Sequence, residues 1–273
     1  MTFSWLKGHG TENDFVLLPD HDGSLHGELD AQFVAALCDR RRGIGADGVL
    51  RVITPAALGI DSDAAWFMDY RNADGSISEM CGNGVRVFAR HLLEEGLVSD
   101  DEFLVGTRDG DKRVVVDGDQ IRVDMGDYVT GGTSKVTTAE GATLEAREVH
   151  TGNPHAVAFV DDLSSAGALL SEPEFDRSVY PEGVNIEFVA RRAHGHVAMR
   201  VHERGSGETR SCGTGACAVA IATALADGQD AAAPRYRVDV PGGTVLVDLT
   251  SDGHVHLTGP AVIVASGTME WRA

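Results

Sequence analysis

Two cysteines lie far apart in the chain but share almost the same local sequence. Met80–Gly84 reads MCGNG and Ser211–Gly215 reads SCGTG, and each motif opens a stretch with the apolar spacing of a helix. A thiol at a helix start meets unpaired amides and the positive end of the helix dipole, which favour the thiolate. Two copies of this unit predict two related halves, each presenting one cysteine, and a site with two thiols.

Two such thiols can move protons without help from another group. A thiol has an ordinary pKa of about 8.5, and a helix N-terminus lowers that pKa, so one sulfur can be thiolate while the other keeps its proton. If the sulfurs flank a tetrahedral carbon, abstraction on one face and delivery on the other inverts the centre. Removal of a proton from a carbon next to a carboxylate gives an unstable carbanion, and we see no sequence that would hold a cofactor to stabilise it. We therefore expect the amides at the two helix starts to bind the carboxylate and stabilise this charge.

The other two cysteines and the composition narrow the class of protein. Cys38 and Cys217 lie in apolar helical sequence and are predicted to be core residues. The chain has four cysteines and no C-x-x-C pair, which predicts neither a disulfide framework nor a metal site. The formal net charge of −19 argues against nucleic acid as a partner, and we interpret it as a solvated surface.

The remaining signals predict a cytoplasmic protein with no membrane partner. No apolar run approaches the roughly 18 residues of a membrane span, and the start of the chain is not a signal peptide. Gly43–Gly48 spells G-x-G-x-x-G, but it follows a predicted helix and precedes a predicted strand, the reverse of a dinucleotide site. We therefore reject a nucleotide-binding function.

Strands and one helix recur in the same order in both halves, which predicts an α+β fold of two domains. The helix after Cys81 is predicted to be half-exposed, and the helix after Cys212 to be buried. We place the domain boundary in the Gly126–Lys135 stretch, which is rich in Gly and Thr and lies between the two sets of strands, and assign residues 1–126 and 127–261 to the two domains. The last strand, about 262–273, is a candidate to pack back on the first half. Other expected strands are Asp14–Leu18, Val49–Ile53, Ala65–Tyr70, Phe103–Val105, Arg113–Val116, Gln120–Asp124, Ala156–Val160, Val184–Val189, Val197–Val201, Tyr236–Val240 and Thr244–Val247, with a helix at Ala31–Cys38.

The two Cys-Gly-x-Gly motifs are part of a series of segments through which the chain resembles the diaminopimelate epimerase family over nearly its whole length. The resemblance implies a cofactor-independent, homodimeric isomerase that interconverts LL- and meso-2,6-diaminopimelate, a step in lysine and peptidoglycan precursor biosynthesis. It also implies two pseudo-symmetric domains, each a mixed β-sheet or barrel wrapped around a central α-helix. The matching segments, in the order of the family, are His9-Gly10, Asn13–Val16, Gly43–Asp47, Tyr70–Ser76, Met80–Gly84, Gly152–His155, Gly183–Asn185, Glu203–Gly205, Glu208-Thr209 and Cys212–Gly215.

The same resemblance implies roles for individual residues. Cys81 and Cys212 correspond to the two acid/base thiols, and His155 and Glu203 to residues that tune the pKa values of the thiols. The reacting end of the substrate would be held by Gly82, Asn83, Gly213 and Thr214. The distal amino acid end would be recognised by Asn13, Asn72, Asn153, Asn185, Glu203 and Arg204, whose amides, carboxylate and guanidinium suit a zwitterion.

Two departures and two alternatives accompany this interpretation. Thr11-Glu12 stands where many relatives have Leu-Gly, and Gly48 stands where some carry a substrate-contacting glutamine. A proline racemase-like or hydroxyproline epimerase-like enzyme would also use a thiol pair, but Asn83 and the Glu203-Arg204 pair favour a substrate with a second charged end. A thiol redox sensor would need no such polar set.

Overall fold

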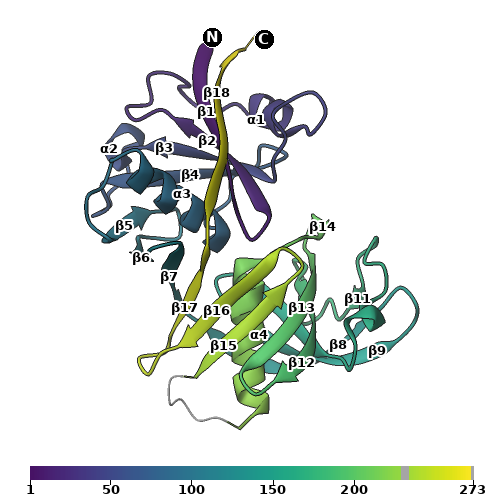
Figure 1. Ribbon diagram of the computed structural model, residues 1–273. Helices are drawn as coiled ribbons and strands as arrows, with labels where there is room; N and C mark the ends of the chain where they lie inside the picture. Colours follow the sequence, from purple (N-terminus) through teal and green to yellow (C-terminus); the bar gives the residue numbers. More distant parts are fainter. Residues whose placement is uncertain (229–233, 272–273) are drawn as a thin grey trace. The chain divides into compact units, whose positions relative to one another are not determined.

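The computed structural model describes residues 1–228 and 234–271, and the chain divides into two compact units (Figure 1). Unit 1 comprises Met1–Val123 and Gly259–Ala273, and unit 2 comprises Asp124–Thr258. The sequence prediction places the corresponding boundaries after residues 126 and 261. The chain therefore leaves unit 1 once and returns to it near its end.

Unit 1 is a sheet of eight strands in the neighbour order β18, β1, β2, β3, β4, β5, β6, β7. Helix α3 follows β4 in the chain and packs against β1, β2, β3, β4 and β18. The elements are β1 (Thr2–Gly10), β2 (Asn13–Pro19), α1 (Ala31–Cys38), β3 (Gly48–Ile53), α2 (Pro55–Leu58), β4 (Trp66–Asn72), α3 (Gly82–Glu94), β5 (Glu102–Gly106), β6 (Lys112–Asp117), β7 (Gln120–Asp127) and β18 (Val262–Glu270).

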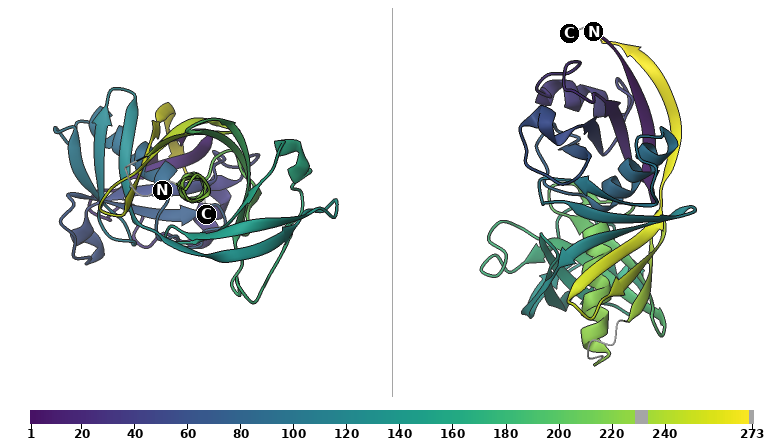
Figure 2. Two further views of the ribbon diagram at one scale, coloured as in Figure 1. Left: turned by 90° about the horizontal axis from the view of Figure 1, so that it is seen from below. Right: turned by 90° about the vertical axis from the view of Figure 1, so that its left-hand side faces the viewer.

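Unit 2 has its main strands in the neighbour order β8, β9, β10, β12, β13, β15, β16, β17. Helix α4 packs against β9, β10, β12, β13, β15 and β16, and the left view of Figure 2 shows it end on inside these strands. The elements are β8 (Val129–Thr137), β9 (Thr143–His150), β10 (Pro154–Phe159), the 3₁₀ turn η1 (Leu163–Ala166), β11 (Glu174–Phe175), β12 (Asn185–Ala193), β13 (His196–Glu203), β14 (Gly207–Glu208), α4 (Gly213–Ala226), β15 (Arg235–Val240), β16 (Gly243–Leu249) and β17 (His254–Pro260).

The two units repeat one topology. Going across each sheet in the order given, successive pairs are antiparallel, antiparallel, parallel, antiparallel, parallel, antiparallel and antiparallel. In both units the central helix connects the fifth strand of this order to the sixth, which runs parallel to it. The predicted α+β fold with two pseudo-symmetric halves is confirmed.

Both central helices are buried, and the prediction of a half-exposed helix after Cys81 was wrong. Polar residues of α3 that suggested a solvated face, including Arg86 and His91, are at most 2% exposed. The guanidinium of Arg86 bonds to Thr11 Oγ1 at 3.3 Å, which lets a charged residue occupy a core position. In α4 the prediction of a buried helix is confirmed, and Cys38 and Cys217 are core residues as expected.

The Gly126–Lys135 stretch, expected to lie between the strands of the two halves, is mostly strand β8. Thr130 and Thr133 flank a bulge in the pairing with β9, and the exposed Gly and Thr residues there resemble a loop in sequence. Five further strands of the described residues escaped prediction: the two-residue strands β11 and β14, and the longer strands β1, β9 and β17. Polar residues on their exposed faces obscure the apolar alternation that marks a strand.

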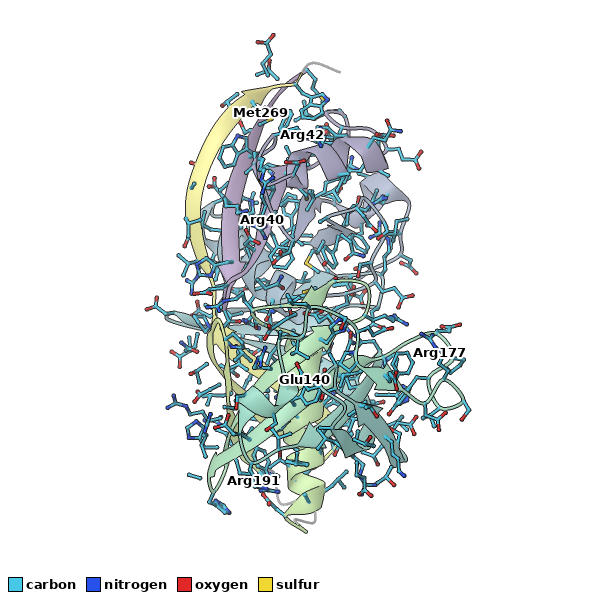
Figure 3. The ribbon with its side chains drawn as sticks, turned by 90° about the vertical axis from the view of Figure 1, so that its right-hand side faces the viewer. Arg40, Arg42, Glu140, Arg177, Arg191 and Met269 are labelled. Carbon is cyan, nitrogen blue, oxygen red and sulfur yellow. The ribbon has the colours of Figure 1, made fainter. Side chains whose placement is uncertain are left out.

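The last strand completes unit 1. Strand β18 pairs antiparallel with β1 from Thr2–Glu270 to His9–Val262, and the right view of Figure 2 follows both strands to the chain ends. Met269, labelled in Figure 3, packs against the cluster that contains Phe3 and Val34. The amide of Trp271 donates to the Met1 carbonyl at 2.7 Å. The C-terminal residues are therefore structural parts of unit 1.

A buried ion cluster lies within unit 1 on β3 and its neighbours. The Arg51 side chain, 2% exposed, donates to Asp20 Oδ2 through Nη2 at 2.7 Å and lies 3.7 Å from Asp69 Oδ2 through Nη1. Although burial opposes it, hydrogen bonds from the Leu25 amide and from Arg51 lower the pKa of Asp20. The cluster thus keeps a buried carboxylate ionised.

Candidate active site

Each of the two cysteines is the N-cap residue of its central helix, as the sequence predicts. Cys81 is the N-cap of α3 and is half-buried, and its Sγ donates to Asn13 Oδ1 at 3.7 Å. Asn83 Nδ2, in the first turn of the same helix, donates to the same Oδ1 at 3.1 Å. Unit 1 therefore gathers three of the predicted residues around one amide oxygen.

Asn72 has a local role in the structure. It ends β4, its Nδ2 donates to Ser76 Oγ at 3.0 Å, and its carbonyl accepts from the Gly75 amide at 2.9 Å. These bonds form a tight turn, a common use of asparagine. A substrate-binding role for Asn72 would have to be added to this turn.

Cys212 is the N-cap of α4 and is buried. Its Sγ accepts from the Gly215 amide at 3.3 Å and lies 3.5 Å from Thr214 Oγ1. The expected lowering of its pKa by the helix is not found in this unit: burial, with repulsion from Glu203 and Glu187, raises the pKa well above its ordinary value. Cys212 is therefore held as the protonated thiol at neutral pH.

Glu203, at the end of β13, faces this thiol. It accepts hydrogen bonds from Thr209 Oγ1 and from Cys212. Burial raises the pKa of Glu203, and the nearby Glu187 raises it further. The predicted link between Glu203 and the charge state of a cysteine thus has a physical basis in unit 2.

Glu187 is a candidate functional residue that the sequence analysis missed. It lies on β12, is fully buried, and its Oε1 is 2.6 Å from His155 Nδ1. Its Oε2 has no hydrogen-bond partner among the described residues. The signal was a glutamate between the apolar residues Ile186 and Phe188 of a predicted strand, a position where a carboxylate is costly unless it has a specific partner.

Among the remaining predicted residues of unit 2, four take part in two hydrogen-bonded groups. His155 Nε2 lies 2.9 Å from Asn153 Oδ1, so His155 joins Glu187 to Asn153. Asn185 Oδ1 accepts from the Arg204 amide at 2.9 Å, and Arg204 Nη1 donates to the Glu182 carbonyl at 3.1 Å. Gly213 begins α4 next to Cys212. In the described residues no group of three or more His, Cys, Asp or Glu side chains is placed to hold a metal ion.

The two departures from the family pattern have structural explanations. Thr11 and Glu12 form the tight turn between β1 and β2 with φ of 51° and 64°, a left-handed conformation that strains a β-branched threonine. The Arg86 bond to Thr11 Oγ1 holds this turn next to Asn13. At Gly48 a Cβ would lie 2.5 Å from the Arg71 carbonyl oxygen, so this backbone has no room for a glutamine.

Gly84 and Gly215 occupy the same position in the two Cys-Gly-x-Gly motifs but differ in the space around them. A Cβ at Gly215 would meet Glu187 Oε1 at 2.8 Å and Cys212 Sγ at 3.2 Å, whereas a Cβ at Gly84 meets no atom closer than Leu50 Cδ2 at 3.3 Å. For the epimerisation expected from the sequence, Gly215→Ala should lower kcat at least tenfold, because Glu187 or the Cys212 thiol must move to make room for the new methyl group. Gly84→Ala should lower kcat less than threefold. Steady-state kinetics of the two variants, with circular dichroism to verify folding, test this; equal losses would contradict it.

Among the described ranges, 1–228 and 234–271, no helix combines the length and apolar character needed to cross a membrane.

Solved structures with this fold include enzymes that act on small molecules. A phenazine biosynthesis protein of the PhzF family from Bacillus anthracis aligns with a TM-score of 0.75 over 99% of this chain and 100% of that chain, at 16% identity. A hydroxyproline epimerase from Agrobacterium vitis aligns with a TM-score of 0.67 over 98% of this chain and 92% of that chain, at 17% identity. At these identities the likeness establishes the fold alone.

Sequence comparison is more specific. The sequence model of the diaminopimelate epimerase family matches residues 5–131 and 148–264. The diaminopimelate epimerase of Streptomyces coelicolor is 54% identical over 98% of this chain and 95% of the relative. That of Thermobifida fusca is 51% identical over 98% of both chains. With a cysteine at the N-cap of the central helix in each of two duplicated units, and with matches over nearly its full length, this chain belongs to the diaminopimelate epimerase family.

Proposed function

We propose that this chain interconverts LL- and meso-2,6-diaminopimelate by moving a proton between two cysteine thiols, without a cofactor. The family and its relatives support the reaction. The observation that most strongly supports the mechanism is that Cys81 and Cys212 occupy the same N-cap position in the two repeats. Inversion of a carbon needs one proton handler on each face, and the repeat supplies two.

In each turnover one sulfur is a thiolate and the other a thiol. The thiolate takes the α-proton, the electrons of the broken C–H bond move onto the substrate carboxylate, and the opposite thiol gives its proton to the other face. The raised pKa of Cys212 suits the proton donor in one direction. Because the thiol and thiolate exchange roles, the resulting enzyme is ready for the reverse reaction.

The amides of the helix starts stabilise the charge that develops on the carboxylate. Gly82 and Asn83 begin α3, and Gly213 and Thr214 begin α4, so their backbone N–H groups lie at the positive ends of the two helix dipoles. We propose that these residues hold the reacting carboxylate and ammonium. A helix N-terminus is suited to this because it carries a partial positive charge and directed donors.

The distal amino acid end of the substrate is assigned to the polar residues around the thiols. Arg204 suits the carboxylate and Glu203 the ammonium, while Asn13, Asn72, Asn153 and Asn185 contribute amides that both donate and accept. His155 and Glu203 also tune the charge state of the thiols, a role supported by the contact of Glu203 with Cys212. We further propose that the enzyme is a cytoplasmic homodimer that acts on this small molecule, with no nucleic acid or membrane partner.

Exchange of the α-proton with solvent tests the proposal directly. LL-diaminopimelate incubated in D₂O with reduced enzyme and no added cofactor should gain deuterium at one α-carbon in each turnover. Mass spectrometry of the substrate and product measures this gain. Proline and trans-4-hydroxyproline serve as comparison substrates for the racemase-like alternative, and both should remain unlabelled. Absence of exchange with diaminopimelate would exclude the epimerase function, and a protein that only forms a reversible disulfide would label none of the three.

A further inference from the structure

We infer that Asp47 is a positioning residue for the thiol site of unit 1: its carboxylate holds the Asn13 amide so that Asn13 Oδ1 faces Cys81 and Asn83. This inference deepens the proposed function and rests on it. It gives a role to the Gly43–Gly48 segment, which has the letters of a nucleotide-binding motif but the wrong structural context. The contacts of this segment, of Asn13 and of the neighbouring charged residues lead to the inference.

The segment is held rigidly by its own backbone. Amides of Ile44 and Gly45 both donate to the Leu37 carbonyl, at 2.9 and 3.0 Å, so the segment folds back on the end of α1. Gly45 has φ of 79°, and a Cβ there would lie 2.8 Å from Arg40 Cα. The Asp47 amide then donates to the Asp14 carbonyl at 2.9 Å, which fixes Asp47 beside the start of β2. Asp47 is therefore placed by the fold before any ligand binds.

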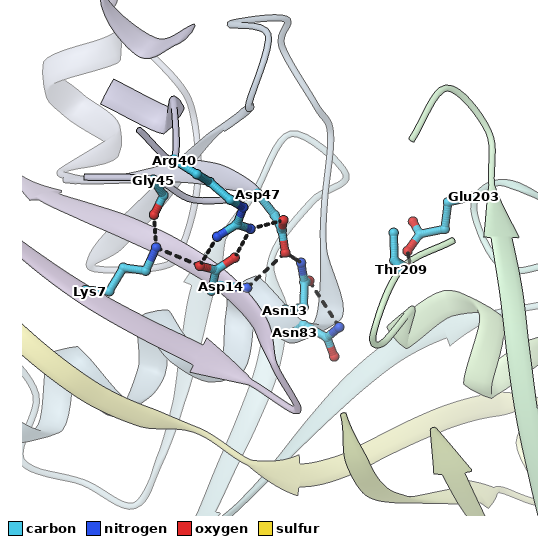
Figure 4. Close-up of polar contacts among 9 residues, drawn as sticks. All are labelled: Lys7, Asn13, Asp14, Arg40, Gly45, Asp47, Asn83, Glu203 and Thr209. Atoms are coloured by element: carbon cyan, nitrogen blue, oxygen red, sulfur yellow. Dashed lines mark hydrogen bonds and ion pairs between the residues drawn. The ribbon is translucent and has the colours of Figure 1, made fainter. Parts of the chain in front are cut away.

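Three donors meet at the Asp47 carboxylate (Figure 4). Oδ2 accepts from Asn13 Nδ2 at 2.8 Å and from the Asp14 amide at 3.1 Å, and Oδ1 accepts from Arg40 Nη2 at 2.7 Å. A carboxylate offers only acceptors to these partners. The side of the Asn13 amide that faces Asp47 must therefore be its NH₂ group.

This contact decides which atom Asn13 presents on its other side. An asparagine amide has one donor end and one acceptor end, so fixing the NH₂ on Asp47 turns Oδ1 away from it. There Oδ1 accepts from Asn83 Nδ2 at 3.1 Å and from Cys81 Sγ at 3.7 Å. The donor of Asn83 demands the same orientation, so the two ends of the Asn13 amide agree. Without Asp47, rotation of the amide by half a turn would present a donor to the sulfur.

The neighbouring charges show that Asp47 is more than one member of an ion pair. Arg40 binds Asp14 through both guanidinium nitrogens, at 3.0 and 2.7 Å, and Lys7 Nζ lies 2.6 Å from Asp14 Oδ2. Burial and the nearby Asp14 carboxylate raise the pKa of Asp47, whereas hydrogen bonds from Arg40 and Lys7, against the effect of burial, hold the pKa of Asp14 well below its ordinary value. Asp14 is the main partner of the cations, and Asp47 is the carboxylate that contacts Asn13.

Because Asp14 mainly binds the cations and Asp47 contacts Asn13, variants of these two residues form a matched pair. Asp47→Ala removes the acceptor of Asn13 Nδ2, and we expect KM for diaminopimelate to rise tenfold or more while kcat falls by a smaller factor. Asp14→Asn weakens the same Arg40 cluster without touching the Asn13 side chain, and its KM should stay within about twofold of the parent while its thermal midpoint falls. Asp47→Asn keeps one acceptor oxygen and should restore KM to within about threefold.

A double-mutant cycle separates positioning from a general loss of structure. If Asp47 acts through Asn13, Asp47→Ala should add nothing to the KM of an Asn13→Ala enzyme. Additive losses, or an Asp47→Ala enzyme with unchanged KM, would overturn the inference. If Asp47→Ala does not fold, Asp47→Ser replaces it, because the serine side chain is too short to reach Asn13. We expect the same rise in KM for diaminopimelate from this variant. A parent enzyme that fails to label diaminopimelate would refute the proposed function instead, since every variant is compared with an active parent.

Discussion

Alanine at Cys81 or at Cys212 should abolish epimerisation, with a loss of at least about 10³-fold in kcat/KM from either change. Each substitution removes the group that handles the proton on one face of the α-carbon, and alanine can neither accept nor donate a proton. Both residues are helix N-caps, and neither α3 nor α4 depends on the sulfur for its packing against the strands. The loss is measured by following conversion of LL- into meso-diaminopimelate with a stereospecific coupled assay.

The other two cysteines provide the controls for this experiment. Cys38 and Cys217 are buried in the core, and burial raises the pKa of Cys38 to about 11, so neither residue has a role in the proposed proton transfer. Cys38→Ala and Cys217→Ala should lower the thermal midpoint through lost packing and retain kcat within about threefold. Turnover that survives Cys81→Ala combined with Cys212→Ala would refute both assignments.

The largest effect on stability is expected from Arg51→Met, which should lower the free energy of unfolding by about 3–5 kcal/mol. The change leaves Asp20, 3% exposed, without its charged partner, and only the amides of Leu25 and His26 remain on its carboxylate. Asp69 keeps Arg71 and Arg108 as partners, so Asp20 accounts for most of the loss. Urea denaturation at pH 7 measures it.

An exposed ion pair in the same unit is the control. Arg42 is 86% exposed in its pair with Asp39, and Arg42→Met should change the free energy of unfolding by less than about 1 kcal/mol.

The pH dependence of the free energy of unfolding gives a second check on the assignment to Asp20. The pKa of Asp20 is lowered in the folded parent, so the parent loses this stabilisation as the pH falls through that value. The difference in free energy of unfolding between the parent and Arg51→Met should therefore become smaller in acid. A difference that does not depend on pH would contradict the assignment to Asp20.

Local sequence was sufficient where structure depends on near neighbours. The helix Ala31–Cys38 was predicted with its observed bounds, since Asp30 caps it and its apolar spacing is regular. The N-cap positions of the two thiols were predicted because the glycines after each cysteine mark a helix start, and the structure confirms them. These features depend on interactions within one or two turns of the chain.

Long-range contacts explain what the sequence could not predict. Arg86 looks like a surface residue until Thr11, far away in the chain, is seen to accept its hydrogen bond in the core. Glu187 looks like a defect in a strand until His155 supplies its partner. The Asp47 contact with Asn13 joins the start of β2 to the residue before β3, and the whole of α1 lies between them in the sequence. The side chains that support the candidate site were thus harder to predict than the cysteines at its centre.

The pairing of β18 with β1 has a consequence for synthesis on the ribosome. Unit 2 is one continuous stretch, Asp124–Thr258, and has all of its strands once that stretch has left the exit tunnel. Unit 1 begins first, but one of the two neighbours of β1 is missing until Val262–Glu270 has left the exit tunnel. Although domains generally fold in order from the N-terminus during translation, here the second unit is complete first. The nascent N-terminal half therefore keeps an open sheet edge at β1 until Val262–Glu270 is available to pair with it.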